Sequence, residues 1–476
     1  MSQIRVIRTL PIIFCLIHLL TIPLAAQDTA SEDRNPVNAA TRAEKGHDLI
    51  SNSQFKSMPS GTVPRDWHIW QPDWQPACCK ITYTPDGVHI TAGKTPYSVS
   101  GLYQDVNGVE GGQAYHIRAS GQIRALADPF QSLLVRIIWQ RQGKAIHPAG
   151  MLVRGPHCRG DDIEFDDILI APHEADSARV SLAVKWLNTG TVTWQQVSMQ
   201  SVPTPTPRAV KIGTVFLRPR NSTPEKNLDL WCEQIDQAGK LGLDVVCLGE
   251  VITKVGTNRS GGECAKPIPG PVTERLGQAA QANRLWVVAG LTERDGNDLY
   301  NTAVLLDRQG ILAGTYRKVH LPREEWKKGI RPGHSYPVFK TDFGVIAMQI
   351  CYDWFFPEPE AIFAQQGAEI IFAPTWGNTL PDADGCVDGE TVFRVRARDN
   401  GVYMVPSVYS GNSLVIDPRG RILASSQGQS GVFWAEVDLD QRDPLPWVGY
   451  WRSIGPRHRR HDTFAPLTKP LIPPAK

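Results

Sequence analysis

Three residues of this 476-residue chain have side chains suited to covalent acyl transfer, and each stands at the end of an apolar segment. Cys351 ends the run that starts at Val345, Glu250 ends the run that starts at Leu243, and Lys318 lies in the segment 314–322, which has the pattern of a strand followed by a turn. A thiol can attack an acyl carbon, a carboxylate can carry the proton, and an ammonium can stabilise the oxyanion. Gathered in one pocket, the three would be sufficient for this chemistry.

The segments that must position these side chains have the pattern of buried strands. Five apolar residues lie between Val345 and Ile350, and Pro357 and Pro359 then suit the entry of a helix. In open α/β sheets, ligands bind beyond the carboxyl ends of the strands. We therefore expect Cys351 at such an edge, with Lys318 close enough to favour the ionised thiol.

In this order, the three segments resemble the nitrilase or carbon-nitrogen hydrolase superfamily. The motifs are a glutamate at a strand end, Tyr-Arg-Lys-x-His-Leu-Pro at 316–322 and Cys-Tyr-Asp-x-x-Phe-Pro-Glu at 351–358. The similarity extends from about residue 210 to 440, and residues 396–401 and 417–420 resemble the family's C-terminal helix and final hairpin.

The resemblance implies a thiol amidohydrolase that acts on a small amide or N-carbamoyl compound and releases ammonia or an amine. Cys351 would form a thioester, Glu250 would act as general base and then general acid, and Lys318 would stabilise the oxyanion. The backbone N–H of Tyr352 is the expected second oxyanion donor. The implied fold is an αββα sandwich that pairs into a homodimer or higher oligomer, with no cofactor and no metal.

Family members carry a second glutamate beyond the lysine, for which the chain offers Glu324 and Glu325. Spacing favours Glu325. His320 is tempting as the base for Cys351, but the equivalent histidine of the family supports structure. Four further residues near the nucleophile or after the strand at 369–374 are expected to form pocket walls, with ordinary loop packing as the alternative: Asp353, Trp354, Trp376 and Asn378.

Each catalytic residue also has a simpler interpretation. A cysteine at the end of an apolar strand is often a small core residue, as we expect for Cys232 and Cys247. A single glutamate or lysine at a strand end is usually solvated or in a surface ion pair. The conjunction of all three residues in the family's order favours catalysis.

The amino terminus has the features of a secretory signal: Arg5 and Arg8, an apolar stretch from Leu10 to Leu24, and a small-residue site near Ala26. We predict a signal peptide at 1–26, a disordered linker at 27–44 and a secreted or periplasmic protein. The near-neutral formal charge of +2 gives no reason to expect nucleic acid as a partner. No later stretch is apolar enough to predict a membrane span.

Residues 45–202 predict an all-β jelly-roll sandwich, because short alternating apolar segments are broken by Gly, Pro, Asn and Asp. The opening and closing segments resemble galactose-binding-like or carbohydrate-binding domains. A carbohydrate is therefore a possible ligand, with Trp67, Trp70 or Trp74 as stacking platforms.

The proline-rich stretch 203–208 is the clearest boundary and predicts a stiff linker. The α/β hydrolase domain is expected at 209–445, followed by a C-terminal tail at 446–476. Its first elements are predicted as a strand at 209–217, a helix at 224–240, a strand at 243–250, a helix at 271–283 and a strand at 285–291.

Nine cysteines are present, and removal of Cys15 with the signal and of a free Cys351 leaves an odd number. One bridge could join Cys158 to the Cys78-Cys79 pair, and another could join Cys264 to Cys386; the sequence decides neither.

Two functions of different class remain from the sequence. One is a secreted amidohydrolase with an accessory sandwich, or its variant, a nitrilase acting on a nitrile. The other is a catalytically inactive protein that binds carbohydrate or cell wall. The intact set of Glu250, Lys318 and Cys351 favours the enzyme.

Overall fold

The computed structural model describes residues 47–56, 63–378 and 388–469. The predicted signal peptide and the whole of the predicted linker lie outside these ranges, as does Cys386. Within these ranges, no helix is both long and apolar enough to cross a membrane.

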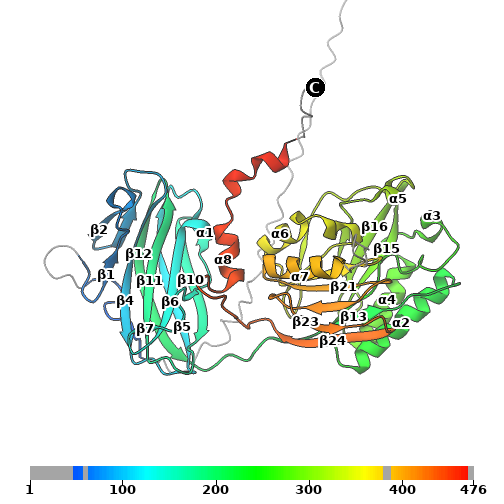
Figure 1. Ribbon diagram of the computed structural model, residues 1–476, viewed down its shortest axis with the longest axis horizontal. Helices are drawn as coiled ribbons and strands as arrows, with labels where there is room; N and C mark the ends of the chain where they lie inside the picture. The colour runs from blue at the N-terminus through cyan, green and yellow to red at the C-terminus, as the bar shows by residue number, and fades with distance from the viewer. Residues whose placement is uncertain (1–46, 57–62, 379–387, 470–476) are drawn as a thin grey trace, which may run out of the picture. The chain divides into compact units, whose positions relative to one another are not determined.

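The N-terminal region forms two antiparallel sheets (Figure 1). One holds β1 (His68–Trp70), β4 (Ser98–Asn107), β11 (Ser177–Leu187), β6 (Leu133–Arg141) and β7 (Lys144–Ala145), with β8 (Met151–Leu152) beside β6. The other holds β2 (Lys80–Thr84), β3 (Gly87–Thr91), β12 (Thr191–Val202), β5 (Ala114–Arg124), β10 (Asp162–Ile170) and β9 (His157–Arg159).

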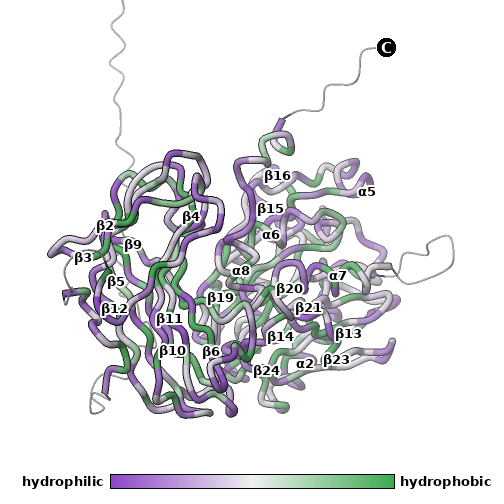
Figure 2. The backbone as a smooth tube through the Cα atoms, turned by 60° about the vertical axis from the view of Figure 1, so that its left-hand side comes forward, coloured by the Kyte–Doolittle hydropathy of each residue, from purple (hydrophilic) through white to green (hydrophobic). Residues whose placement is uncertain are grey.

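Polar and apolar residues alternate along these strands (Figure 2), and apolar residues of both sheets form a shared core. Trp194 of β12 and Phe165 of β10 are fully buried there, with ring centroids 5.7 Å apart. Trp67 also belongs to this core, since it is 3% exposed and packs on Phe55. Its prediction as a sugar platform is therefore wrong, whereas Trp70 and Trp74 are exposed.

The C-terminal half is an α/β fold with two six-stranded mixed sheets. The first holds β17 (Leu312–Arg317), β16 (Asp298–Leu306), β15 (Trp286–Asp295), β14 (Val245–Cys247), β13 (Ala209–Phe216) and β24 (Gly431–Asp438). The second holds β18 (Val338–Lys340), β19 (Val345–Met348), β20 (Ile370–Pro374), β21 (Tyr403–Ser407), β22 (Leu414–Ile416) and β23 (Ile422–Ser425).

Helices cover the outer faces of the two sheets (Figure 1). The helices are α2 (Pro224–Lys240), α4 (Pro271–Asn283), α6 (Glu358–Gln365) and α7 (Asp388–Asn400), with α3 (Gly261–Cys264) and α5 (Arg323–Trp326) as short turns. Helix α2 starts where predicted, because the Thr223 side chain caps the N–H of Lys226.

The side chains in and just after β14 pack against both the second sheet and the outer helices. Val245 and Cys247 face the core between the sheets, while Val246 and Leu248 face α2 and α4. A strand buried on both faces reads as a continuous apolar run, as the sequence indicated. The strand is shorter than the predicted 243–250, although Leu248 still donates its N–H to the carbonyl of Val288.

No disulfide joins the cysteines that the structure describes. Cys78, Cys79 and Cys158 are free, so the suggested bridge within the sandwich is not formed. Cys79 is buried, whereas Cys158 lies exposed on β9, so the two thiols are in different environments.

A buried carboxyl group on α6 supports the segment that carries the nucleophile. Glu360 accepts a hydrogen bond from Gln349 Nε2 at 2.9 Å, and Nε of Arg396 lies 3.8 Å from its other oxygen. Burial raises the pKa of Glu360 to about 8, outweighing the opposing effects of these two neighbours. The carboxyl group is therefore neutral in the folded protein at pH 7.

This raised pKa predicts a pH dependence of stability. The stabilisation that comes from the higher pKa of Glu360 in the folded state is fully present below the ordinary carboxyl pKa of 4.5. It is lost as the pH rises toward 8, because in that range Glu360 ionises in the unfolded state and not in the folded state. Glu360→Gln should flatten the fall in unfolding free energy between pH 5 and 9, measured by urea denaturation. The exposed Glu324→Gln serves as control; parallel profiles for wild type and Glu360→Gln would contradict the prediction.

Candidate active site

Glu250 lies just beyond the carboxyl end of β14 and is 2% exposed. Its backbone carbonyl accepts a hydrogen bond from the Tyr409 hydroxyl. The Gly290 N–H donates to the carbonyl of Gly249 at 2.9 Å, which extends the β14–β15 pairing up to the glutamate. A Cβ on Gly290 would lie 2.7 Å from the Cα of Glu250, so only glycine permits this close approach.

Lys318 follows β17 directly and is 1% exposed. Its Nζ donates to Oε1 of Glu250 at 3.1 Å and to Oε1 of Glu325 at 2.9 Å. The Asn301 Nδ2 donates to the same two oxygens, at 2.8 and 2.9 Å. One ammonium and one amide therefore hold two carboxylates together in a buried site.

Cys351 follows β19 and opens the 3-10 helix η3 (Cys351–Phe355) with a backbone φ of +43°. That left-handed conformation is uncommon for a residue with a Cβ. The Glu250 side chain and the backbone of Trp376 lie close enough to the sulfur to shift its pKa. The structure thus brings all three predicted catalytic side chains into one cluster.

The electrostatics of the cluster differ from the sequence expectation of an ionised thiol. Burial and the negative charge of Glu250 raise the pKa of Cys351 well above its usual range, although Lys318 acts in the opposite direction. Burial acts to lower the pKa of Lys318, but the neighbouring Glu250 and Glu325 raise it overall. The resting state at neutral pH is therefore a thiol beside a charged lysine, and attack requires a base.

Of the two candidate glutamates, Glu325 is the one that contacts Lys318, at 2.9 Å. Burial raises its pKa, with Lys318 opposing and Glu250 adding to the shift. Glu324, by contrast, pairs with Arg323 at 2.8 Å in solvent.

Asp353 forms the centre of a buried network next to the nucleophile. Its two carboxylate oxygens accept hydrogen bonds from the Tyr316 hydroxyl at 2.8 Å, the His320 backbone at 2.9 Å and the Ile350 backbone at 3.0 Å. His320 Nδ1 also lies 2.9 Å from Asp353, and its ring stacks on Phe356. Asp353 and His320 therefore hold the turn around Cys351, and Asp353 is not an open pocket wall.

The remaining predicted pocket residues divide between the core and more exposed positions. Trp354 is 2% exposed and packs on Phe393 in the main core, which fits the alternative of ordinary packing. Trp376 is 42% exposed and lies next to the sulfur through its backbone. Asn378 is buried and exchanges hydrogen bonds with the backbone of Asn412. The Tyr352 ring packs on Phe355; the oxyanion role of its N–H stays a prediction.

Sequence reasoning missed three contributors: Asn301, Tyr409 and Lys254. Asn301 and Tyr409 lie in β16 and after β21, where no motif marks them. Lys254 belongs to the loop after Glu250, and its Nζ lies 5.9 Å from the centroid of the Trp376 ring. It forms no ion pair with the carboxylates in the part of the chain that the structure describes.

Comparisons with known proteins identify the family of the C-terminal half. The sequence profile of the carbon-nitrogen hydrolase family matches residues 211–446. A nitrilase of Pyrococcus abyssi is 33% identical over 245 residues, which cover 48% of this chain and 90% of that protein.

This chain belongs to the carbon-nitrogen hydrolase family. It is a nitrilase-superfamily hydrolase that acts on carbon-nitrogen bonds other than peptide bonds. An omega-amidase of Xenopus tropicalis is 28% identical, covering 50% of this chain and 91% of that protein. Among solved structures, a carbon-nitrogen hydrolase of Helicobacter pylori aligns with 55% of this chain and 99% of its own, at 22% identity and a TM-score of 0.46.

We expect Lys318, which contacts both Glu250 and Glu325, to contribute strongly to the stability of this hydrolase. Lys318→Ala should lower the unfolding free energy by about 3–5 kcal/mol at pH 7, because two buried carboxylates would lose their common cation. The deficit should shrink toward pH 5, since one carboxylate can then bind a proton. Urea denaturation at both pH values measures it, with the exposed neighbour Lys327→Ala as control. An equally small loss in both variants would contradict the prediction.

Proposed function

We propose that this hydrolase is a thiol amidohydrolase that cleaves a small amide or N-carbamoyl compound through a thioester on Cys351. The observation that supports the proposal is the position of the Cys351 thiol beside Glu250, whose carboxylate accepts a hydrogen bond from Lys318 at 3.1 Å. A protonated nucleophile, a base within reach and a fixed cation are the parts that acyl transfer requires.

In the proposed reaction, the sulfur bonds to the carbonyl carbon while its proton passes to Glu250. Lys318 Nζ and the Tyr352 N–H stabilise the oxyanion that forms. Glu250 then returns the proton to the departing nitrogen, and ammonia or an amine leaves. Water, deprotonated by Glu250, attacks the thioester, releases the acid and restores the thiol.

The site also favours this enzyme over an inactive binding protein. A buried cluster of Glu250, Glu325 and Lys318 is expensive to maintain, because each charge loses its hydration. A purely structural role would be served as well by apolar residues. Nitrile hydrolysis uses the same groups and is the alternative substrate chemistry.

A panel of simple amides, N-carbamoyl amines and nitriles tests the proposal, with released ammonia as the readout. At least one amide or N-carbamoyl compound should be hydrolysed by wild type. Cys351→Ala and Glu250→Gln should each lose at least about a thousandfold in kcat/KM, equivalent to about 4 kcal/mol of transition-state stabilisation. Equal ammonia release by wild type and Cys351→Ala would contradict it, and turnover of nitriles alone would favour the alternative.

Lys254 indicates which kind of acyl group the proposed substrate carries. A cation that lies over the Trp376 ring and has no carboxylate partner among the described residues suits an acyl group with an anionic far end.

We therefore expect Lys254→Ala to raise KM about tenfold, or about 1.4 kcal/mol, for an amide whose acyl chain ends in a carboxylate. The KM of the matched neutral amide should not change. The exposed Lys240→Ala on α2 is the control. A change that is equal for both amides would contradict a role in charge recognition.

The proposal includes two predictions from the sequence: export through the segment at 1–26, and pairing of the hydrolase domain into a dimer or higher oligomer. Export would place the enzyme where a sandwich domain can meet extracellular carbohydrate.

A further inference from the structure

A buried tyrosine that follows the second sheet holds the proposed base, which follows the first. Tyr409 lies two residues after β21, is 1% exposed, and donates a hydrogen bond from its hydroxyl to the backbone carbonyl of Glu250. A Cβ on Gly249 would overlap this hydroxyl, so a glycine is needed beside the contact. Burial raises the pKa of Tyr409 well above its usual range, so the hydroxyl keeps its proton at neutral pH.

The carbonyl that Tyr409 holds belongs to a strained peptide. Val251, the next residue, has a φ of +44°, a left-handed conformation that is rare for a β-branched side chain. Conformations of this kind persist only where the surrounding contacts fix them. The Glu250 carbonyl and the Val251 N–H belong to the same peptide unit. Rotation of this unit would turn the Glu250 side chain, and the hydrogen bond from Tyr409 opposes that rotation.

The Tyr409 ring is itself held in place by two tryptophans. It packs at steep angles against the rings of Trp231 of α2 and Trp376, with centroids 6.2 and 5.5 Å away. The Tyr409 N–H also donates to the carbonyl of Trp376 at 3.0 Å. The backbone of Trp376 lies close to the Cys351 sulfur. Tyr409 therefore contacts both the residue that carries the carboxylate and the segment beside the thiol.

Other hydrogen bonds join the two sheets near this point. Thr214 Oγ1 of β13 donates to the carbonyl of Pro406 at 2.8 Å, and Ser407 Oγ of β21 donates to the carbonyl of Val215 at 2.6 Å. These buried bonds keep the sheets joined without the Tyr409 hydroxyl. Loss of that hydroxyl should therefore act on Glu250 and not on the packing of the two sheets.

We propose that Tyr409 is a positioning residue, whose hydroxyl fixes the peptide between Glu250 and Val251 and so sets the approach of the Glu250 carboxylate to the Cys351 thiol. The phenol takes no part in the proton transfer, since its single proton is donated to the carbonyl. This role rests on the proposed function, in which Glu250 removes the proton from the thiol.

The test follows alkylation of Cys351 by iodoacetamide at pH 7, in which the sulfur displaces iodide from carbon and the thiol proton passes to Glu250. Peptide mass spectrometry reports the rate on the Cys351 peptide alone. Tyr409→Phe keeps the ring and should slow this rate at least about tenfold, because the base is misplaced. For a hydrolysed amide, the same variant should lower kcat by a similar factor and change KM by less than about twofold.

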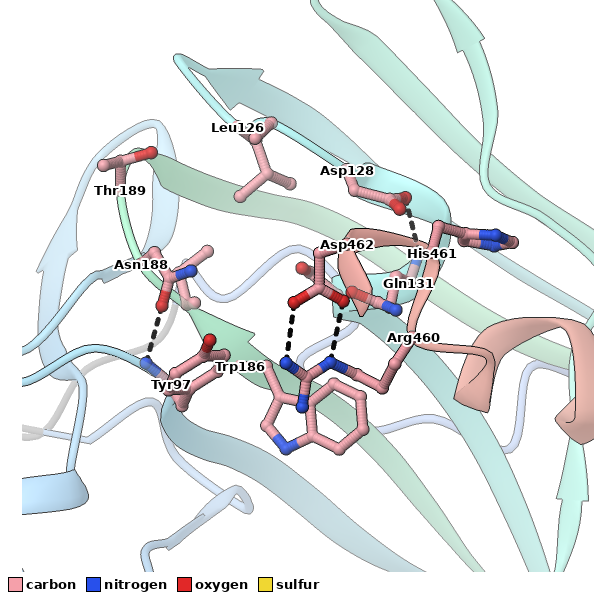
Figure 3. A pocket seen from close by; sticks show the side chains of 13 residues that line it. Tyr97, Leu126, Asp128, Gln131, Trp186, Asn188, Thr189, Arg460, His461 and Asp462 are labelled. Atoms are coloured by element: carbon pink, nitrogen blue, oxygen red, sulfur yellow. Dashed lines mark hydrogen bonds and ion pairs between the residues drawn. The ribbon is translucent and has the colours of Figure 1, made fainter. Parts of the chain in front are cut away.

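A double-variant cycle separates positioning from general damage. If Tyr409 acts only through the carboxylate, Tyr409→Phe should slow alkylation by less than about twofold in a Glu250→Gln background. A loss of packing would slow both backgrounds equally. Tyr97→Phe is the matched control and should leave both rates unchanged. Tyr97 lines a cavity of about 220 Å³ on the sandwich together with Trp186 and Arg460 (Figure 3).

Gly249→Ala keeps the test decisive if Tyr409→Phe fails to fold, because the added methyl displaces the same hydroxyl and should also slow alkylation. The proposal is overturned if Tyr409→Phe is alkylated at the wild-type rate, or if the double variant shows the full additional loss. Equal alkylation of wild type and Glu250→Gln would overturn the proposed base itself, and the role of Tyr409 with it.

Discussion

The active half of this hydrolase depends on one buried ammonium shared by two carboxylates. Lys318 contacts Glu250 and Glu325 at 3.1 and 2.9 Å, and all three come from different segments. The attraction among them offsets the loss of hydration only while the geometry is kept, so the surrounding fold must be rigid. Asn301 bridges the same two oxygens, and the Tyr409 hydroxyl holds the backbone of Glu250. Rigidity here also supplies the preorganisation that an oxyanion needs.

The two central sheets supply that rigidity from opposite sides. The strand before Glu250 and the strand before Lys318 belong to the first sheet, while the strand before Cys351 belongs to the second. A single apolar core joins the sheets, which fixes the distance between the base and the nucleophile. The Asp353 network then sets the turn at Cys351, and the resulting environment keeps the thiol protonated beside Glu250, the proposed base.

Much of this arrangement could be predicted because it is local or carried by motifs. The helix at 224–240 follows from its capping threonine and apolar stripe, and the catalytic residues follow from their position after buried strands. Asn301 and Tyr409 could not be found, because an asparagine within a strand and a tyrosine after one have no distinguishing pattern. Trp354 and Trp67 show the same limit, since a tryptophan in a loop can face the core or the solvent. The net pKa of Cys351 depends on burial and on Glu250 together, and neither is visible in spacing.

The covalent intermediate tests the central claim most directly. Wild-type enzyme should be mixed with a substrate amide, quenched in acid within the first turnovers and digested for peptide mass spectrometry. The account predicts an acyl group on the peptide that contains Cys351, absent from Cys351→Ala. Turnover without any acylated peptide, or an acyl group on a different residue, would contradict it.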